Sequence, residues 1–110
     1  MTIEVPPARV GEVARVSVTL EAPAAATGVV AVGLPPGAVL ADAPAGLRQV
    51  GDTVELAIER ADQGAARRYE IPVRSGFAGA LQSAPHRIVL SGAEALLPPS
   101  RWEIRPAGGG

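Results

Sequence analysis

Four segments of the chain alternate between large apolar residues and polar or small ones. In residues 14–20, Ala, Val, Val and Leu alternate with Arg, Ser and Thr, and residues 54–58, 68–74 and 101–105 repeat the pattern. Side chains of a β-strand point alternately to its two faces. Each segment is therefore expected to bury one face and expose the other.

Residues 29–34 and 87–90 are nearly continuous apolar runs, and shorter strands are expected at residues 3–5 and 47–50. Pro or Gly interrupts nearly every window that could hold a helix. The pattern predicts an all-β fold, an immunoglobulin-like antiparallel β-sandwich of seven or eight strands. The residues expected to share its core are Val16, Val18, Val30, Val32, Leu56, Ile58, Ile71 and Val73.

Glycine and proline positions indicate the turns and the sheet edges. The pair Gly51-Asp52 predicts a type II′ hairpin turn, and Pro36-Gly37 fits the centre of a type II turn. Gly33, inside an apolar run, suggests a bulge, and Pro72 places its strand at an edge or a bulge because proline lacks an N–H. The strands around Pro72 and Trp102 are the expected edges, where a partner strand could add.

Composition excludes several classes of site and partner. The chain has 110 residues and no Cys, so it has no disulfide, thiolate metal site or thiol nucleophile. Ten Arg, no Lys and 11 acidic residues give a net charge of −1, which argues against a nucleic acid partner. No apolar run reaches the roughly 18 residues of a membrane span. No signal peptide is expected, because no basic stretch and apolar run begin the chain.

The length predicts one β-sandwich domain over residues 1–106, followed by a flexible Gly-rich tail at residues 107–110. Arg without Lys, together with abundant Ala, Gly and Pro, is a composition that GC-rich genomes favour.

Strand and turn motifs follow one another in a defined order between residues 10 and 56. Val-Gly-Glu-Val and an alternating strand occupy residues 10–20, and Gly-Val-Val-Ala-Val-Gly-Leu-Pro-Pro-Gly occupies residues 28–37. Gly-Asp-Thr-Val-Glu-Leu follows at residues 51–56, before the Tyr-containing strand. Over residues 10–80 this order resembles the prealbumin-like conserved repeat of bacterial surface proteins. Gly33 departs from that family, which usually has an acidic or polar residue there.

A second resemblance involves the later part of the chain. Residues 69–74, 76–79 and Pro85 are similar to a β-sandwich domain in the C-terminal region of bacterial alpha-2-macroglobulins. The next Tyr-containing strand of that family and its thioester Cys have no counterpart here. Both families stay open, and both imply an extracytoplasmic β-sandwich module without catalysis of its own.

Candidate catalytic and metal-binding residues are few. His86 is the only His, and without a Gly-x-Ser-x-Gly motif it is expected to be an exposed side chain at the edge of a loop. Asp42, Asp52 and Asp62 recur every ten residues, but they are expected in turns at opposite ends of the fold, too far apart for one calcium ion. No catalytic residue, cofactor or metal ligand is predicted.

Two aromatic residues are structural or interaction candidates. Tyr69 follows a Gly-containing loop, as in a tyrosine corner, so its hydroxyl is expected to bond the backbone near Asp62 or Gly64. Trp102 alternates with Ile104 and is expected in the core rather than on a carbohydrate-binding surface.

Arg101 and Arg105 are the two other candidates. Together with Arg68 and Arg74 they would form a basic stripe if their strands were neighbours. Glutamates lie between them in the sequence, so cross-strand ion pairs are the favoured interpretation.

The expected function is that of a non-catalytic structural or protein-interaction module of a larger bacterial cell-envelope or secreted protein. One alternative is an accessory domain of an alpha-2-macroglobulin-like protease inhibitor, and another is a carbohydrate-binding module. The expected partners are neighbouring domains or another protein, rather than nucleic acid or a small molecule. The expected location is extracytoplasmic.

Overall fold

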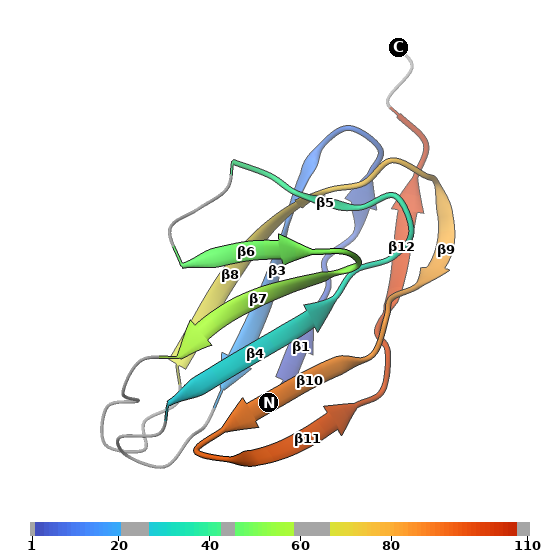
Figure 1. The fold of residues 1–110 in the computed structure, drawn as a ribbon. Helices are drawn as coiled ribbons and strands as arrows, with labels where there is room; N and C mark the ends of the chain where they lie inside the picture. The colour runs from blue at the N-terminus through green and yellow to red at the C-terminus, as the bar shows by residue number, and fades with distance from the viewer. Residues whose placement is uncertain (1, 21–26, 43–45, 59–66, 108–110) are drawn as a thin grey trace.

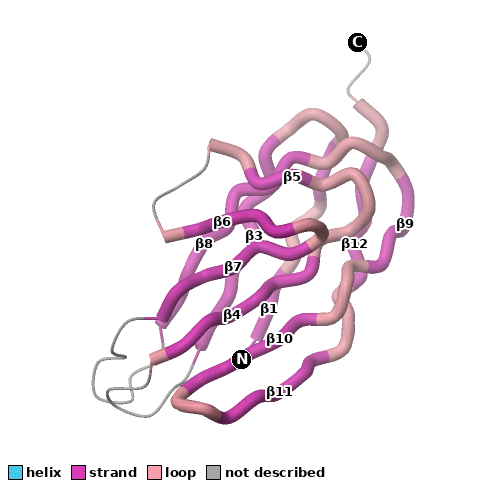
Figure 2. Tube along the Cα trace, viewed as in Figure 1, coloured by secondary structure: helices cyan, strands magenta, loops and turns pink. Residues whose placement is uncertain are grey.

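The protein is a β-sandwich, and the residues that the structure describes contain no helix (Figure 1). The computed structural model describes residues 2–20, 27–42, 46–58 and 67–107. These ranges hold only strands and loops (Figure 2), so no helix in them could cross a membrane. The strands are β1 (Thr2–Glu4), β2 (Ala8–Arg9), β3 (Val13–Leu20), β4 (Gly28–Gly33), β5 (Val39–Leu40), β6 (Leu47–Val50), β7 (Thr53–Ile58), β8 (Arg67–Arg74), β9 (Gly79–Gln82), β10 (His86–Leu90), β11 (Ala93–Leu97) and β12 (Arg101–Arg105).

Two larger sheets form the layers of the sandwich. One has four strands in the order β1-β3-β8-β5, and the other has five in the order β11-β10-β4-β7-β6. A third sheet, β2-β12-β9, lies beside them (Figure 1). Among the described strands, the pairing of β2 with β12 is parallel and the others are antiparallel. The predicted antiparallel β-sandwich is confirmed.

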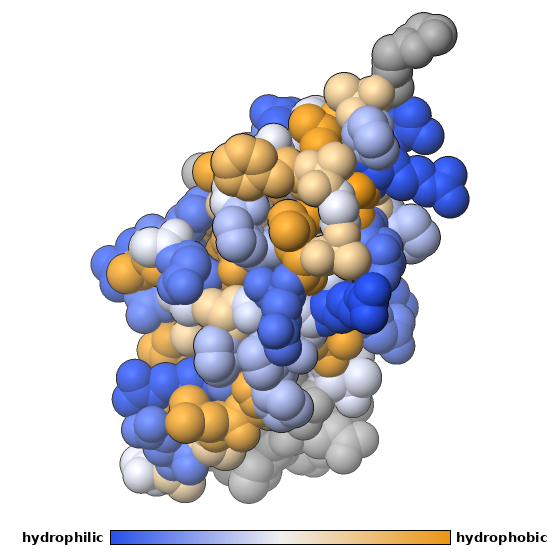
Figure 3. All heavy atoms as spheres, turned by 90° about the vertical axis from the view of Figure 1, so that its right-hand side faces the viewer, coloured by the Kyte–Doolittle hydropathy of each residue, from blue (hydrophilic) through white to orange (hydrophobic). Residues whose placement is uncertain are grey.

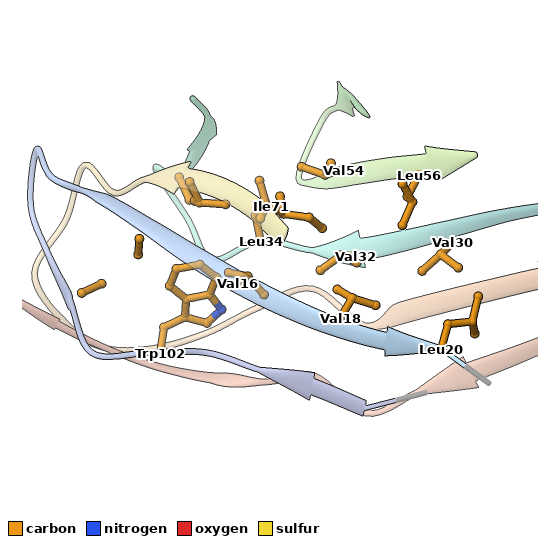
Figure 4. Close-up of a cluster of buried hydrophobic side chains, with 14 of the residues drawn as sticks. Val16, Val18, Leu20, Val30, Val32, Leu34, Val54, Leu56, Ile71 and Trp102 are labelled. Atoms are coloured by element: carbon orange, nitrogen blue, oxygen red, sulfur yellow. The ribbon is translucent and has the colours of Figure 1, made fainter. Parts of the chain in front are cut away.

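The core between the layers is aliphatic, with one indole ring (Figure 4). Val16 lies opposite Ile71 in one sheet, and Val30 lies opposite Leu56 in the other. These positions follow from the alternation, which sends every second side chain inward. All eight residues predicted for the core are at most 6% exposed, which confirms the predicted faces of these strands.

The strand count exceeds the prediction, because the described residues form twelve strands rather than seven or eight. Strands β2 and β5 have only two residues each, too few to show a pattern. Strand β11 is exposed along most of its length, so its sequence carries no buried face to recognise. The first strand lies at residues 2–4 instead of 3–5.

The predicted edge position of the Trp102 strand is wrong. Strand β12 lies between β2 and β9, with Trp102 opposite Leu81 and Ile104 opposite Ala8. The strand pairs on both sides because β2, a two-residue segment that the pattern did not reveal, adds to it in parallel.

Pro72 marks the place where a neighbouring strand ends. It lies opposite Arg15 of β3, while on the other side β5 pairs only with Val73 and Arg74. The carbonyl of Pro72 accepts a hydrogen bond from the Ala41 amide at 2.9 Å. The N–H and C=O of one residue point to the same side of an antiparallel strand, so the missing donor of Pro72 also faces β5. Before Pro72, β8 has no described partner on that side, which agrees with the predicted edge.

The two predicted turns are confirmed. Gly51 has φ 59° and Asp52 has no positive φ, as a type II′ turn requires. Gly37 has φ 76°, and the Ala38 amide donates to the Pro35 carbonyl at 3.2 Å, which closes the type II turn.

Leu56→Ala is expected to lower the free energy of unfolding by roughly 2–5 kcal/mol, because it removes buried methyl groups and leaves a cavity. Urea denaturation measures the change. Val50→Ala is the matched control, since Val50 is 47% exposed at the sheet edge and should lose less than about 1 kcal/mol. Equal losses in the two variants would contradict the assigned core.

Candidate functional site

Strands β9 to β12 form one long hairpin that bends in the middle. Strands β10 and β11 pair in the five-stranded sheet, and β9 and β12 pair in the three-stranded sheet. Prolines within the bend, which spans residues 83–85 and 98–100, have no N–H for a ladder. Ser83 and Ser100 hold the bend instead. The Ser83 amide donates to the Ser100 carbonyl, and the Ser100 amide donates to Ser83 Oγ, both at 2.9 Å.

His86 follows the bend directly, and its side chain is 2% exposed. The Gly33 amide donates to Nδ1 at 2.9 Å, and Nε2 lies 2.8 Å from Ser100 Oγ. An amide N–H can only donate, so Nδ1 carries no proton and the neutral ring holds its proton at Nε2. The imidazole therefore joins β4 to the bend through two hydrogen bonds.

The expectation of an exposed His86 is wrong. His86, Ile88 and Leu90 share one face of β10, and the two aliphatic residues pack against the core. The alternation through β10 was therefore the signal that could have placed His86 inside. Burial lowers the pKa of His86 below its ordinary 6.5, because desolvation disfavours the charged ring.

Gly33 is required by the close approach of two chain segments, and the predicted bulge at this position is wrong. Gly33 pairs in regular register with Thr53. A Cβ atom at Gly33 would lie 1.9 Å from the Ala84 carbonyl oxygen, so any other residue would push β4 away from the bend. The Ala84 amide also donates to the Leu34 carbonyl at 3.2 Å.

The contact between His86 and Ser100 has the residue types of a hydrolase site, but the donor and acceptor roles are reversed. A general base must offer a lone pair to the serine hydroxyl, and the nitrogen facing Ser100 bears the proton instead. The other nitrogen, which a carboxylate orients in a catalytic triad, is occupied by the Gly33 amide. This arrangement holds the serine in place and does not activate it.

The predicted turn role of the aspartates agrees with their backbone. Asp42 has φ 59°, a conformation that Asp tolerates, and Asp52 lies in the hairpin turn. Asp62 lies outside the described residues. Across the described ranges, no three His, Cys, Asp or Glu side chains gather as metal ligands would.

Trp102 lies in the core at 1% exposure, among side chains that include Val16 and Val18 (Figure 4). A carbohydrate-binding surface needs an exposed ring, and this ring is covered. Its Nε1 has no hydrogen-bond partner among the described residues. The indole therefore contributes apolar volume where β12 meets the sandwich.

Tyr69 is half-buried on the inner face of β8, opposite Val18. The partners expected for its hydroxyl, near Asp62 and Gly64, lie outside the described residues. The tyrosine corner stays a prediction.

The strands of the conditional basic stripe are not neighbours, because β8 and β12 belong to different sheets, and the cross-strand ion pair favoured for Arg101 is wrong. Arg101 pairs with Glu103 of its own strand at 2.9 Å, with both side chains mostly exposed, so the pair is worth less than about 1 kcal/mol. Arg105 lies opposite Arg9 of β2. Arg68, on β8, donates to Ser17 Oγ at 3.0 Å.

Cross-strand ion pairs occur at positions that the sequence did not single out. Arg48 of β6 contacts Glu55 of β7 at 2.7 Å, and Arg87 of β10 contacts Glu94 of β11 at 2.9 Å. Both pairs are solvent-exposed and lie on the outer face of the five-stranded sheet.

Comparisons with protein-family models and with curated proteins find no match to this chain. The two family resemblances described above therefore stay predictions.

The free energy of unfolding is expected to fall as the pH drops from about 7.5 to about 5. The folded pKa of His86 lies below 6.5, so the unfolded chain takes up the proton first. The stability contribution is complete above pH 6.5 and is lost as the pH falls through the lowered folded pKa. Urea denaturation across this range measures the slope.

His86→Gln is the matched control, because it keeps a hydrogen-bonding side chain that does not titrate. This variant is expected to lose the slope between about pH 7 and about pH 5. An equally steep slope in the variant would assign the effect to other groups.

Proposed function

We propose that the protein is a non-catalytic structural module that joins neighbouring domains end to end in a larger bacterial cell-envelope or secreted protein. The observation that carries the proposal is the placement of the first and last described residues, Thr2 and Ala107. They lie toward opposite ends of an elongated fold that measures 49 × 24 × 21 Å (Figure 1).

The register between β2 and β12 supports this placement. The two strands run parallel, with Ala8 level with Ile104. Thr2 precedes Ala8 by six residues, and Ala107 follows Ile104 by three. At about 3.3 Å per extended residue, the two ends are separated by up to roughly 30 Å along the shared direction. A domain before the module and a domain after it would then meet different ends.

The sheet orders support an immunoglobulin-like subtype of the sandwich. In the immunoglobulin plan, strands A, B, E and D form one sheet, and C, F and G form the other. The order β1-β3-β8-β5 matches the first sheet, and β11-β10-β4 matches the second. The hairpin of β6 and β7, which follows β5 in the chain, is an addition to this plan.

The polar chemistry also supports a structural role. His86 and the two serines of the bend use their polar atoms to hold the hairpin. On the face that carries β9 and β12, small apolar patches alternate with polar residues, and no single broad apolar patch is seen (Figure 3). Interspersed surfaces of this kind suit exposure to water along a chain of modules.

Two copies fused in tandem through a short linker are expected to give a particle with about twice the 49 Å length of one copy. Small-angle X-ray scattering measures the longest dimension. A fusion through a long, flexible Gly/Ser linker serves as the control and should give a broader distribution of distances between the two copies. A short-linker particle no longer than a single copy would contradict end-to-end joining.

A further inference from the structure

We propose that strand β11 is a docking edge for β11 of a second copy of this chain, which gives a two-fold dimer with a continuous sheet. The proposal rests on the proposed role as a non-catalytic module and names one partner for it. The carrying observation is an open strand edge that is fixed at both ends and whose one charged side chain is already paired with a neighbouring strand.

Strand β11 is the outermost strand of the five-stranded sheet and pairs only with β10 among the described strands. Its first four residues are exposed, and Leu96 is 69% exposed. Its one charged side chain, Glu94, is already paired with Arg87 at 2.9 Å. Proline within an edge strand opposes pairing, and β11 itself holds none, because Pro98 and Pro99 lie after its last residue, Leu97.

The edges of the four-stranded sheet and the other edge of the five-stranded sheet are protected. Strand β1 has only three residues, and Pro72 removes a donor from the open side of β8. At the β6 edge, Gln49 accepts a bond from the Leu40 amide and donates to the Ala38 carbonyl, which ties the β5 segment alongside.

The edge of β9 is flanked by the proline-containing loop at residues 34–37. The Ala84 amide, just after β9, donates to the Leu34 carbonyl at 3.2 Å. Just before β9, the Phe77 ring lies against Gly37, where an added Cβ would come within 2.4 Å of it. The contrast leaves β11 as the unprotected long edge in the described part of the fold.

Both ends of β11 are fixed. Ser91 and Gly92 have φ 47° and 83°, so the turn before β11 is of type I′, and the Ser91 amide donates to the Thr27 carbonyl at 2.8 Å. After β11, Ser100 is held by His86 and Ser83. A strand that is already ordered loses little conformational entropy when another strand pairs with it.

The two-residue turn determines which backbone groups face outward. Leu90 and Ala93 flank the turn as a hydrogen-bonded pair, so Ala93, Ala95 and Leu97 direct their backbone groups toward β10. Glu94 and Leu96 therefore direct their N–H and C=O groups to the open side. Each copy offers two donors and two acceptors to an incoming strand.

A second copy satisfies all of these groups when a two-fold axis passes through Ala95. The antiparallel register then places Glu94 of each copy opposite Leu96 of the other, and both pairs are hydrogen-bonded. Ala95 meets its own counterpart at a non-hydrogen-bonded position, where Cα atoms approach to about 4.5 Å. The small side chain fits that approach. The interface closes on itself, so the product is a dimer and not a fibre.

The test is sedimentation equilibrium of the whole chain between about 10 µM and about 1 mM, the range for a small interface. The wild type is expected to dimerise weakly. Leu96→Glu places two like-charged pairs across the axis and should weaken the dimer roughly fivefold or more. Leu96→Lys faces Glu94 of the second copy and should tighten the dimer or leave it unchanged.

Val50→Glu adds the same charge at the opposite sheet edge and is expected to leave the dimer unchanged. Thermal unfolding shows that each variant is folded. A wild type that stays monomeric throughout would overturn the proposal, and so would equal weakening by both Leu96 variants. Either result would leave the length of the tandem fusion unaffected, so failure of the β11 pairing is distinguishable from failure of end-to-end joining.

Discussion

The hydrogen bond from the Gly33 amide to the His86 ring is the constraint on which this fold depends. It joins β4, a central strand of the five-stranded sheet, to the bend of the long hairpin. A buried amide without a partner costs about 1–3 kcal/mol, so the ring must accept there. That requirement fixes the proton at Nε2, directs it to Ser100, and favours the neutral form.

Side-chain hydrogen bonds in the bend replace backbone hydrogen bonds that the prolines cannot make. Pro85, Pro98 and Pro99 interrupt the ladder between the two halves of the hairpin, and serine and histidine side chains take over the missing bonds. The halves can then join different sheets: β12 carries Trp102 into the core, and β11 continues outward as an edge. One polar cluster thus supports both the packing of the last strand and the exposure of the docking edge.

Alternation in the sequence predicted the core faces of β3, β7 and β8 because their inner side chains are large and their outer ones polar or small. The turns at Gly51 and Gly37 were predicted because positive φ favours glycine. Strand β11 was missed because it buries no face, and β2 because two residues show no period. The alternation of His86 with Ile88 and Leu90 could have placed its side chain inside, but its partners, an amide and a serine from distant segments, meet only in the folded chain.

The central claim is that His86 is a neutral structural bridge with its proton on Nε2. Nitrogen-15 NMR of the imidazole, recorded as a function of pH, measures both the tautomer and the pKa. The account predicts the Nε2-protonated tautomer at neutral pH and a midpoint below 6.5. An Nδ1-protonated ring, or a midpoint above 6.5, would contradict it.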